Sequence, residues 1–177
     1  CMLIMEHGWR DSDYAATIAE LCPELETTRS GDELHAKRLP FLRHVITVGY
    51  SQKGAMTWEQ ALGRSVDTPV EEVWRRAANV RIHDVCNMQY TSGTTGFPKG
   101  VMLTHYNVVN DGKCIGDRMD LSTADRMMIQ VPMFHCFGMV LAMTATMTHG
   151  GTILPLPYFS PKPALACINA ERITAFH

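Results

Sequence analysis

A glycine- and hydroxyl-rich run near the middle of the chain constrains the fold more than any other feature. Residues 90–100 read Tyr-Thr-Ser-Gly-Thr-Thr-Gly-Phe-Pro-Lys-Gly, and the segments on both sides have strand character. Glycine lets the backbone turn sharply and approach a ligand closely. The N–H groups of such a turn bind anions, serine and threonine hydroxyls add donors, and lysine supplies a compact positive charge. The run therefore predicts a β-hairpin whose tip folds over a triphosphate.

This run differs from the common phosphate loops. A Walker A loop places Gly-Lys-Ser/Thr at the start of a helix, whereas Lys99 lies between Pro98 and Gly100 and precedes a strand-like segment. The spacing of the glycines also differs from that of Rossmann and kinase loops. A surface turn without function is the alternative, but the flanking strands, the proline and the lysine favour phosphate binding.

Two motifs resemble those of the adenylate-forming acyl-CoA synthetases and ligases. Residues 91–101 are similar to the nucleotide-binding motif of that family. Residues 131–138 (Val-Pro-Met-Phe-His-Cys-Phe-Gly) are similar to the second motif of its fatty-acid-activating branch. The resemblance implies that residues 1–177 are an incomplete segment of the large N-terminal AMP-binding domain, with the C-terminal domain absent. It also implies ATP-dependent activation of a carboxylic acid, of the fatty-acid type, to an acyl-adenylate and then to a coenzyme A thioester.

The resemblance assigns roles to individual residues. Thr91 and Lys99 are the implied catalytic residues. The implied nucleotide-binding residues are Thr91, Ser92, Gly93, Thr94, Thr95, Gly96 and Lys99. The implied acid-binding residues are His135, Phe137 and Gly138. A helix cap or a half-buried position is the alternative for His135, and an ordinary core position is the alternative for the other two. Mg²⁺ is implied with ATP, but no residue of this chain is assigned to it.

Strand-like segments and capped helices alternate along the chain. This order predicts an α/β fold with βαβ units and a largely parallel sheet, in which ligands bind at the carboxyl ends of strands. Strands are predicted at residues 1–5, 45–48, 85–91, 101–104, 126–131, 151–155 and 173–176. Helices are predicted after Asp13, after capping boxes that begin at Thr57 and Thr68, and at residues 105–118, 135–148 and 161–171. Residues 26–43 are predicted to form a long loop.

The composition excludes several classes of protein. The formal net charge of −2 gives no indication of a nucleic-acid partner. Six cysteines without metal-ligand spacing are predicted to be mostly buried thiols in a reducing cytosol. The apolar run at residues 133–147 is too short to span a bilayer. Together with an N-terminus that shows no targeting segment, these features favour a cytoplasmic enzyme that acts on a small carboxylate, ATP and coenzyme A, with no integral membrane segment and with its oligomeric state open.

Two other functions remain open at this point. One is an amino-acid-activating adenylation domain, in which the second motif usually carries aspartate after phenylalanine; here the pair is Phe134-His135, which favours a simpler acid. The other is a nucleotide-binding fragment without catalysis. Because the chain begins and ends in strand-like segments, we expect it to be part of a longer protein whose activity this segment alone lacks.

Overall fold

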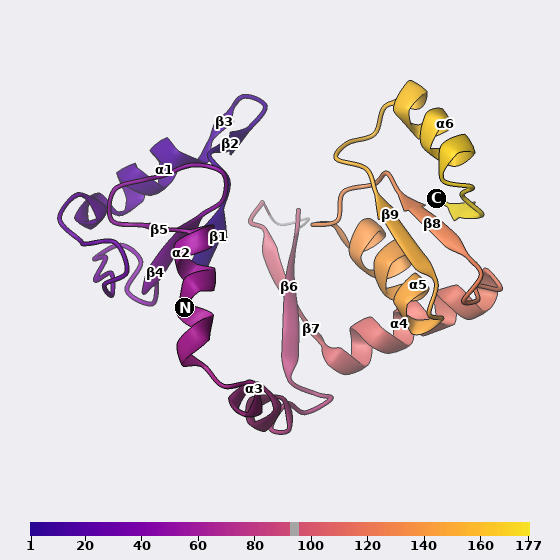
Figure 1. The fold of residues 1–177 in the computed structure, drawn as a ribbon, viewed down its shortest axis with the longest axis horizontal. Coiled ribbons are helices and arrows are strands. Elements are labelled where there is room, and N and C mark those ends of the chain that lie inside the picture. The colour runs from indigo at the N-terminus through magenta and orange to yellow at the C-terminus, as the bar shows by residue number, and fades with distance from the viewer. Residues whose placement is uncertain (93–95) are drawn as a thin grey trace. The chain divides into compact units, whose positions relative to one another are not determined.

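A computed structural model describes residues 1–92 and 96–177, and these residues form two compact units (Figure 1). Unit 1 comprises Cys1–Ala78 and unit 2 comprises Asn79–His177. Each unit contains a three-stranded parallel sheet, so the predicted α/β class with parallel pairing is confirmed. The parallel strands are divided between two small sheets, one in each unit.

The sheet of unit 1 has the order β1-β4-β5 and all of its pairs are parallel. Its strands are β1 (Met2–Met5), β4 (His44–Thr47) and β5 (Met56–Thr57). The short strands β2 (Gly8–Trp9) and β3 (Ser12–Asp13) form an antiparallel pair before the helix α1 (Tyr14–Leu21) and the 3₁₀ turn η1 (Pro23–Glu26). No helix or strand lies at residues 27–43, yet this loop contributes Leu34, Ala36 and Leu42 to the core of the unit.

Two of the predicted helix starts in unit 1 are confirmed and one is wrong. The Asp13 carboxylate caps α1, and Thr57 and Gln60 form both bonds of a capping box at α2 (Trp58–Gly63). The predicted capping box at Thr68 does not form. Thr68 is instead the C-cap of a 3₁₀ turn, η2 (Arg64–Asp67), and its backbone is extended, as is usual before proline. The helix α3 (Val70–Ala77) begins later and has no side-chain cap.

Unit 2 begins with the predicted hairpin and continues into a second sheet. Strands β6 (Val85–Thr91) and β7 (Lys99–Thr104) pair in antiparallel fashion, and the helix α4 (His105–Arg118) follows β7 directly. The parallel sheet has the order β10-β8-β9, with β8 (Arg126–Ile129), β9 (Thr152–Pro155) and β10 (Ala175–Phe176). Strands β8 and β10 are two residues shorter than predicted. The helix α6 (Pro161–Ala170) lies between β9 and β10 in the sequence.

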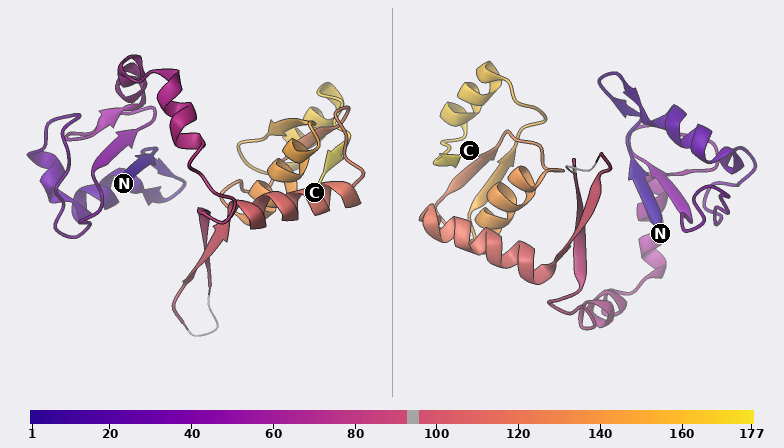
Figure 2. Two further views of the ribbon diagram at one scale, coloured as in Figure 1. Left: turned by 90° about the horizontal axis from the view of Figure 1, so that it is seen from below. Right: turned by 180° about the vertical axis from the view of Figure 1, so that it is seen from behind.

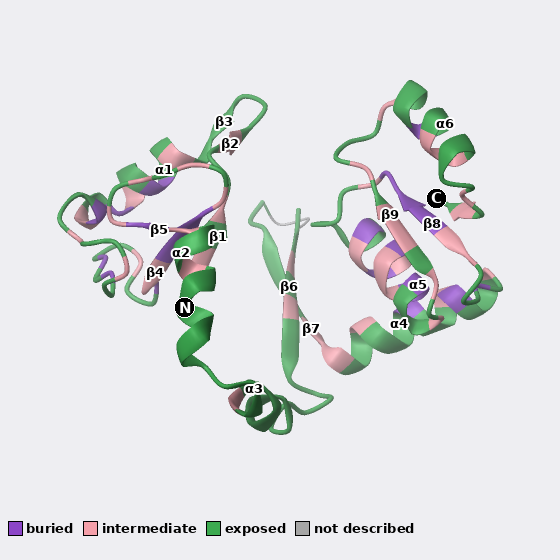
Figure 3. Cartoon of the chain, in the orientation of Figure 1, coloured by how far each residue is buried: buried purple, intermediate pink, exposed green. Residues whose placement is uncertain are grey.

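The segment predicted as one apolar α-helix at residues 135–148 is mostly a π-helix. Phe137–Thr144 form the π-helix η3, and only Ala145–Thr148 form the α-helix α5. A π-helix has i→i+5 hydrogen bonds, and long examples are rare. Burial in unit 2 is concentrated on β8, η3 and α5 (Figure 3). The core of this unit therefore depends on how the neighbouring elements pack against the π-helix η3.

Two glycines let α4 lie close to η3 and α5. A Cβ on Gly112 would lie 2.7 Å from Thr144 Cγ2, and a Cβ on Gly116 would lie 2.3 Å from two atoms of the His149 ring. Real Cβ atoms do not approach other atoms this closely. Glycine at both positions, one helical turn apart, is therefore what allows this packing.

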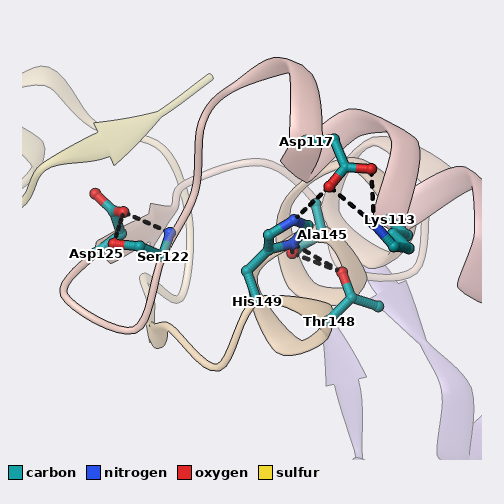
Figure 4. A network of polar contacts seen from close by, with 7 residues as sticks. All are labelled: Lys113, Asp117, Ser122, Asp125, Ala145, Thr148 and His149. Atoms are coloured by element: carbon teal, nitrogen blue, oxygen red, sulfur yellow. Dashed lines mark hydrogen bonds and ion pairs between the residues drawn. The ribbon is translucent and has the colours of Figure 1, made fainter.

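A network of polar contacts fastens the same helices (Figure 4). The His149 ring is largely buried; its Nε2 lies 3.1 Å from Asp117 Oδ1 and its Nδ1 lies 2.9 Å from the carbonyl oxygen of Ala145. The ammonium of Lys113 lies 2.7 Å from Asp117 Oδ2. Hydrogen bonds from Lys113 and then from His149 lower the pKa of Asp117. The carboxylate therefore joins α4 to the end of α5.

Most of the cysteines are more exposed than the sequence predicted. Cys22 is buried and Cys167 is half-buried, whereas Cys1, Cys86, Cys114 and Cys136 are exposed, so the prediction of mostly buried thiols is wrong. Cys86 lies on a largely exposed hairpin strand and Cys114 lies on the outer side of α4, positions that residue type alone does not reveal. Within the two described ranges, no helix is both long and apolar enough to cross a bilayer.

We expect Gly116→Ala to destabilise the protein, because the new methyl group would overlap the His149 ring and lie 2.9 Å from the carbonyl oxygen of Ala145. Overpacking of this kind costs about 1–3 kcal/mol. Gly63→Ala in α2 is the matched control, since a Cβ there meets no atom within 4 Å. Urea unfolding should show a lower free energy of unfolding for Gly116→Ala and a slightly higher one for Gly63→Ala. Equal stabilities would contradict the packing described.

The network also predicts a dependence of stability on pH. Because folding lowers the pKa of Asp117, its contribution is present above the unfolded pKa of about 3.9 and is lost as the pH falls through the lower folded value. Asp117→Asn should therefore reduce the free energy of unfolding at pH 7 and flatten its fall below about pH 4.

Asp111→Asn, on the exposed surface of the same helix, is the control for this measurement. In Asp111→Asn, the free energy of unfolding measured with urea should fall below about pH 4 as it does in the wild type. An Asp117→Asn profile that is parallel to the wild type at every pH would argue against the network.

Candidate functional site

Strands β6 and β7 form a two-stranded hairpin, whose backbone can be followed in Figure 2. This hairpin pairs the two implied catalytic residues across its strands. Thr91, the last residue of β6, is the cross-strand partner of Lys99, the first residue of β7. Side chains of directly opposed residues lie on the same face of an antiparallel pair. The hydroxyl and the ammonium group are therefore neighbours on one face, at the base of the loop between the strands.

The two faces of this hairpin differ in character. Gln89 and Asn87 share the face of Thr91, are half-buried, and are joined by a 2.8 Å hydrogen bond from Gln89 Nε2 to Asn87 Oδ1. Met88, Tyr90 and Met102 occupy the opposite face and are exposed. Thr91 and Lys99 thus lie on the polar face.

The tip of the hairpin is described in part. Gly93, Thr94 and Thr95 lie outside the described residues. Gly96 has a φ of +89°, in the left-handed region that favours glycine, and open space surrounds its Cα. Among the side chains that the structure describes, Lys99 forms no ion pair, so its charge is not neutralised by a protein carboxylate. This charge is available to an anionic ligand.

The capping role that was the alternative for His135 from the sequence is present in the structure. The backbone N–H of Phe137 donates to His135 Nδ1 at 3.1 Å, so the ring caps the start of the following helix. Because Nδ1 accepts, the proton of the neutral ring is on Nε2. The side chain is exposed. Its Nε2–H group is thus a donor that a carboxylate ligand can use while Nδ1 stays engaged.

Phe137 and Gly138 have different surroundings. The Phe137 ring packs against the His177 ring with 5.2 Å between centroids. Gly138 is buried, and a Cβ there would lie 2.4 Å from the carbonyl oxygen of Pro132 and 2.8 Å from Met133 Cα. Glycine at this position lets the start of η3 pack against the backbone of Pro132 and Met133, which follow β8. The structure thus places His135, Phe137 and Gly138 together at the carboxyl end of β8.

Two polar residues that flank the segment of His135 in the sequence were not identified from the sequence. Gln130, directly after β8, is buried; its Nε2 donates to the carbonyl oxygen of His177, and its Oε1 has no partner in the described part of the chain. Thr144 ends η3 and donates to a carbonyl oxygen within it. A glutamine at the end of an apolar strand was a visible signal, whereas a threonine in an apolar helix was not.

A metal site is not evident among these residues. In the described ranges, no group of three or more histidine, cysteine, aspartate or glutamate side chains is placed to hold a metal ion. No Mg²⁺ ligand is therefore assigned.

A hollow of about 490 Å³ lies in unit 2, beside β7, α4 and η3. Its lining residues are Val101, Met102, Leu103, Asn107, Val108, Asp111 and Val140. Val101 and Leu103 lie on the same face of the hairpin as Lys99. The polar end of this face thus continues into an apolar surface.

Comparison with known proteins identifies the family. The family model described as AMP-binding enzyme matches residues 5–177. YngI of Bacillus subtilis (strain 168), provisionally named an acyl-CoA synthetase, is 40% identical over 99% of this chain and 32% of its own length. The human mitochondrial medium-chain acyl-CoA ligase ACSF2 is 33% identical over 97% of this chain and 29% of its own length.

Solved structures agree with this result. The anthranilate CoA ligase AuaEII in complex with anthranoyl-AMP superposes with a TM-score of 0.65 at 21% identity, over 99% of this chain and 30% of that one. This likeness shows the fold. The chain spans about a third of the length of these relatives. With a family match over nearly its whole length, the chain belongs to the AMP-binding enzyme family, whose matched members are named acyl-CoA synthetases and ligases.

Proposed function

We propose that the whole protein uses ATP to activate a carboxylic acid and transfers the acyl group to coenzyme A. The observation that carries this proposal is the Thr91–Lys99 pair at the base of the hairpin loop, in a chain of the AMP-binding family. Fatty or other simple acids are the proposed substrates, because His135 follows Phe134 in the second motif and the human relative is named a medium-chain acyl-CoA ligase.

The first step places charge where this hairpin can stabilise it. A carboxylate oxygen of the acid attacks the α-phosphorus of ATP, and the bond from that phosphorus to the pyrophosphate oxygen breaks. Negative charge therefore develops on pyrophosphate. The Lys99 ammonium and the Thr91 hydroxyl, together with Ser92, Gly93, Thr94, Thr95 and Gly96, are the proposed donors around the β- and γ-phosphates. Fixed donors of this kind stabilise a transition state electrostatically.

The acid is the proposed ligand of the second group of residues. His135 Nε2–H donates to its carboxylate, since Nδ1 is occupied by the backbone N–H of Phe137. Phe137 and Gly138 bound the site beside this histidine. In the second step the thiol of coenzyme A attacks the acyl carbonyl carbon, the bond to the AMP oxygen breaks, and AMP leaves.

Mg²⁺ is the usual partner of ATP phosphates. The described residues offer no carboxylate cluster for it, so none of the steps above is assigned to the ion. We place the whole protein in the cytoplasm, which is consistent with six free cysteines in the chain. The proposed partners are ATP, coenzyme A and a small carboxylate.

Lys99→Ala in the full-length protein should slow acid-dependent ATP–pyrophosphate exchange. Loss of one fixed donor in a transition-state site lowers kcat by about 10²–10³-fold. The thermal unfolding midpoint should stay unchanged, because Lys99 is an exposed side chain without an ion pair among the described residues.

Lys162→Ala, which removes an exposed lysine from α6, is the matched control. It should leave both exchange and stability at wild-type values. Exchange by Lys99→Ala at the wild-type rate would refute the role of the hairpin. Exchange that depends on an amino acid, with no response to simple carboxylic acids, would favour an amino-acid-activating adenylation domain instead.

A further inference from the structure

One side chain at the end of the π-helix η3 makes a hydrogen bond with the spacing of that helix. The Thr144 hydroxyl donates to the carbonyl oxygen of Met139, five residues earlier, at 2.8 Å. Threonine hydroxyls in α-helices usually bond to the carbonyl three or four residues earlier. Two nearby threonines do so, since Thr146 bonds to Ala142 and Thr148 bonds to Ala145. The Thr144 bond therefore follows the register of the π-helix.

A short path of contacts leads from this bond to His135. The backbone N–H of Met139 donates to the carbonyl oxygen of His135 at 3.0 Å, and that of Gly138 donates to the same oxygen at 3.1 Å. Met139 thus makes both bonds: its N–H donates to His135, and its carbonyl oxygen, in the next peptide unit, accepts from Thr144. The His135 ring is held in turn by the N–H of Phe137. Met139 therefore links the Thr144 hydroxyl to the backbone of His135.

Thr144 is itself fixed by its methyl group. Its Cγ2 lies where a Cβ of Gly112 would be only 2.7 Å away, so the methyl group packs directly against the backbone of α4. One side chain thus has two separable functions. The methyl group anchors it to α4, and the hydroxyl group fixes the carbonyl of Met139.

We propose that Thr144 is a positioning residue for the acid-binding histidine. Its hydroxyl holds the first turns of η3 in the wide register, and this register sets where the His135 Nε2–H group lies. The inference rests on the proposed function for the role of His135 toward the acid. A π-helix is less favourable than an α-helix and is frequently found at functional sites. Its retention beside His135 agrees with a role in placing that side chain.

The two functions of Thr144 are separated by two substitutions in the full-length protein. Thr144→Val keeps the shape and the methyl packing but removes the hydroxyl group. Thr144→Ser keeps the hydroxyl group but removes the methyl group. Thr146→Val is the control, because Thr146 is fully buried and its hydroxyl makes an ordinary bond to Ala142 that does not lead to His135.

Two measurements are made on each variant. Hydrogen–deuterium exchange reports the protection of the amides at residues 135–139. ATP–pyrophosphate exchange, with octanoate as the probe acid, reports kcat and KM for the acid and for ATP. Thr144→Val should speed amide exchange in this segment and lower kcat/KM for octanoate about tenfold or more, because small misplacements of a contact group have effects of this size. KM for ATP should not change.

Thr144→Ser should retain wild-type amide protection and wild-type kcat/KM, even where it lowers stability. Thr146→Val should lower stability without either effect. Equal losses in Thr144→Val and Thr144→Ser, or wild-type amide exchange in Thr144→Val, would overturn the proposal. If the wild type shows no exchange with octanoate, the proposed acid is wrong, and the amide protection of the Thr144 variants still decides whether Thr144 positions His135.

Discussion

The close approach of α4 to η3 and α5 is the constraint on which unit 2 depends. It exists because Gly112 and Gly116 carry no side chains where Thr144 and His149 must fit. Polar groups then fix the contact, since Asp117 accepts from both Lys113 and His149. As α4 follows β7 directly, the same helix also continues from the strand that begins with Lys99. The helix that supports the core therefore leads to the candidate nucleotide site.

The two groups of candidate residues are built in different ways. The candidate phosphate-binding residues depend on a local feature, an antiparallel hairpin that makes Thr91 and Lys99 cross-strand neighbours. The acid-binding residues depend on the type of helix, because His135 is held by the first turn of η3 and the Thr144 hydroxyl bonds in the register of this π-helix. A local hairpin tolerates changes elsewhere in the chain. The position of His135, by contrast, depends on the hydrogen bonds made in the first turns of η3.

The sequence was most informative where structure is determined locally. The strand-like segments at residues 85–91 and 101–104 predicted the two strands that flank the loop, and the Thr57–Gln60 capping box formed as predicted. The Thr68 box failed because a 3₁₀ turn ended at the same residue. The π-helix was not predictable, since residues 137–144 are apolar on every face and give no periodicity from which to read the helix type. The Thr144 hydroxyl, which bonds to Met139 in the register of the π-helix, gives no such signal in the sequence either.

The central claim is that the polar face of the hairpin binds the phosphates of ATP. The most direct test is a crystal structure of the full-length protein with ATP, or with the acyl-adenylate and pyrophosphate. The account predicts β- and γ-phosphate oxygens, or those of pyrophosphate, within about 3 Å of Lys99 Nζ and Thr91 Oγ1. Phosphates bound elsewhere, with Lys99 and Thr91 facing solvent, would contradict it.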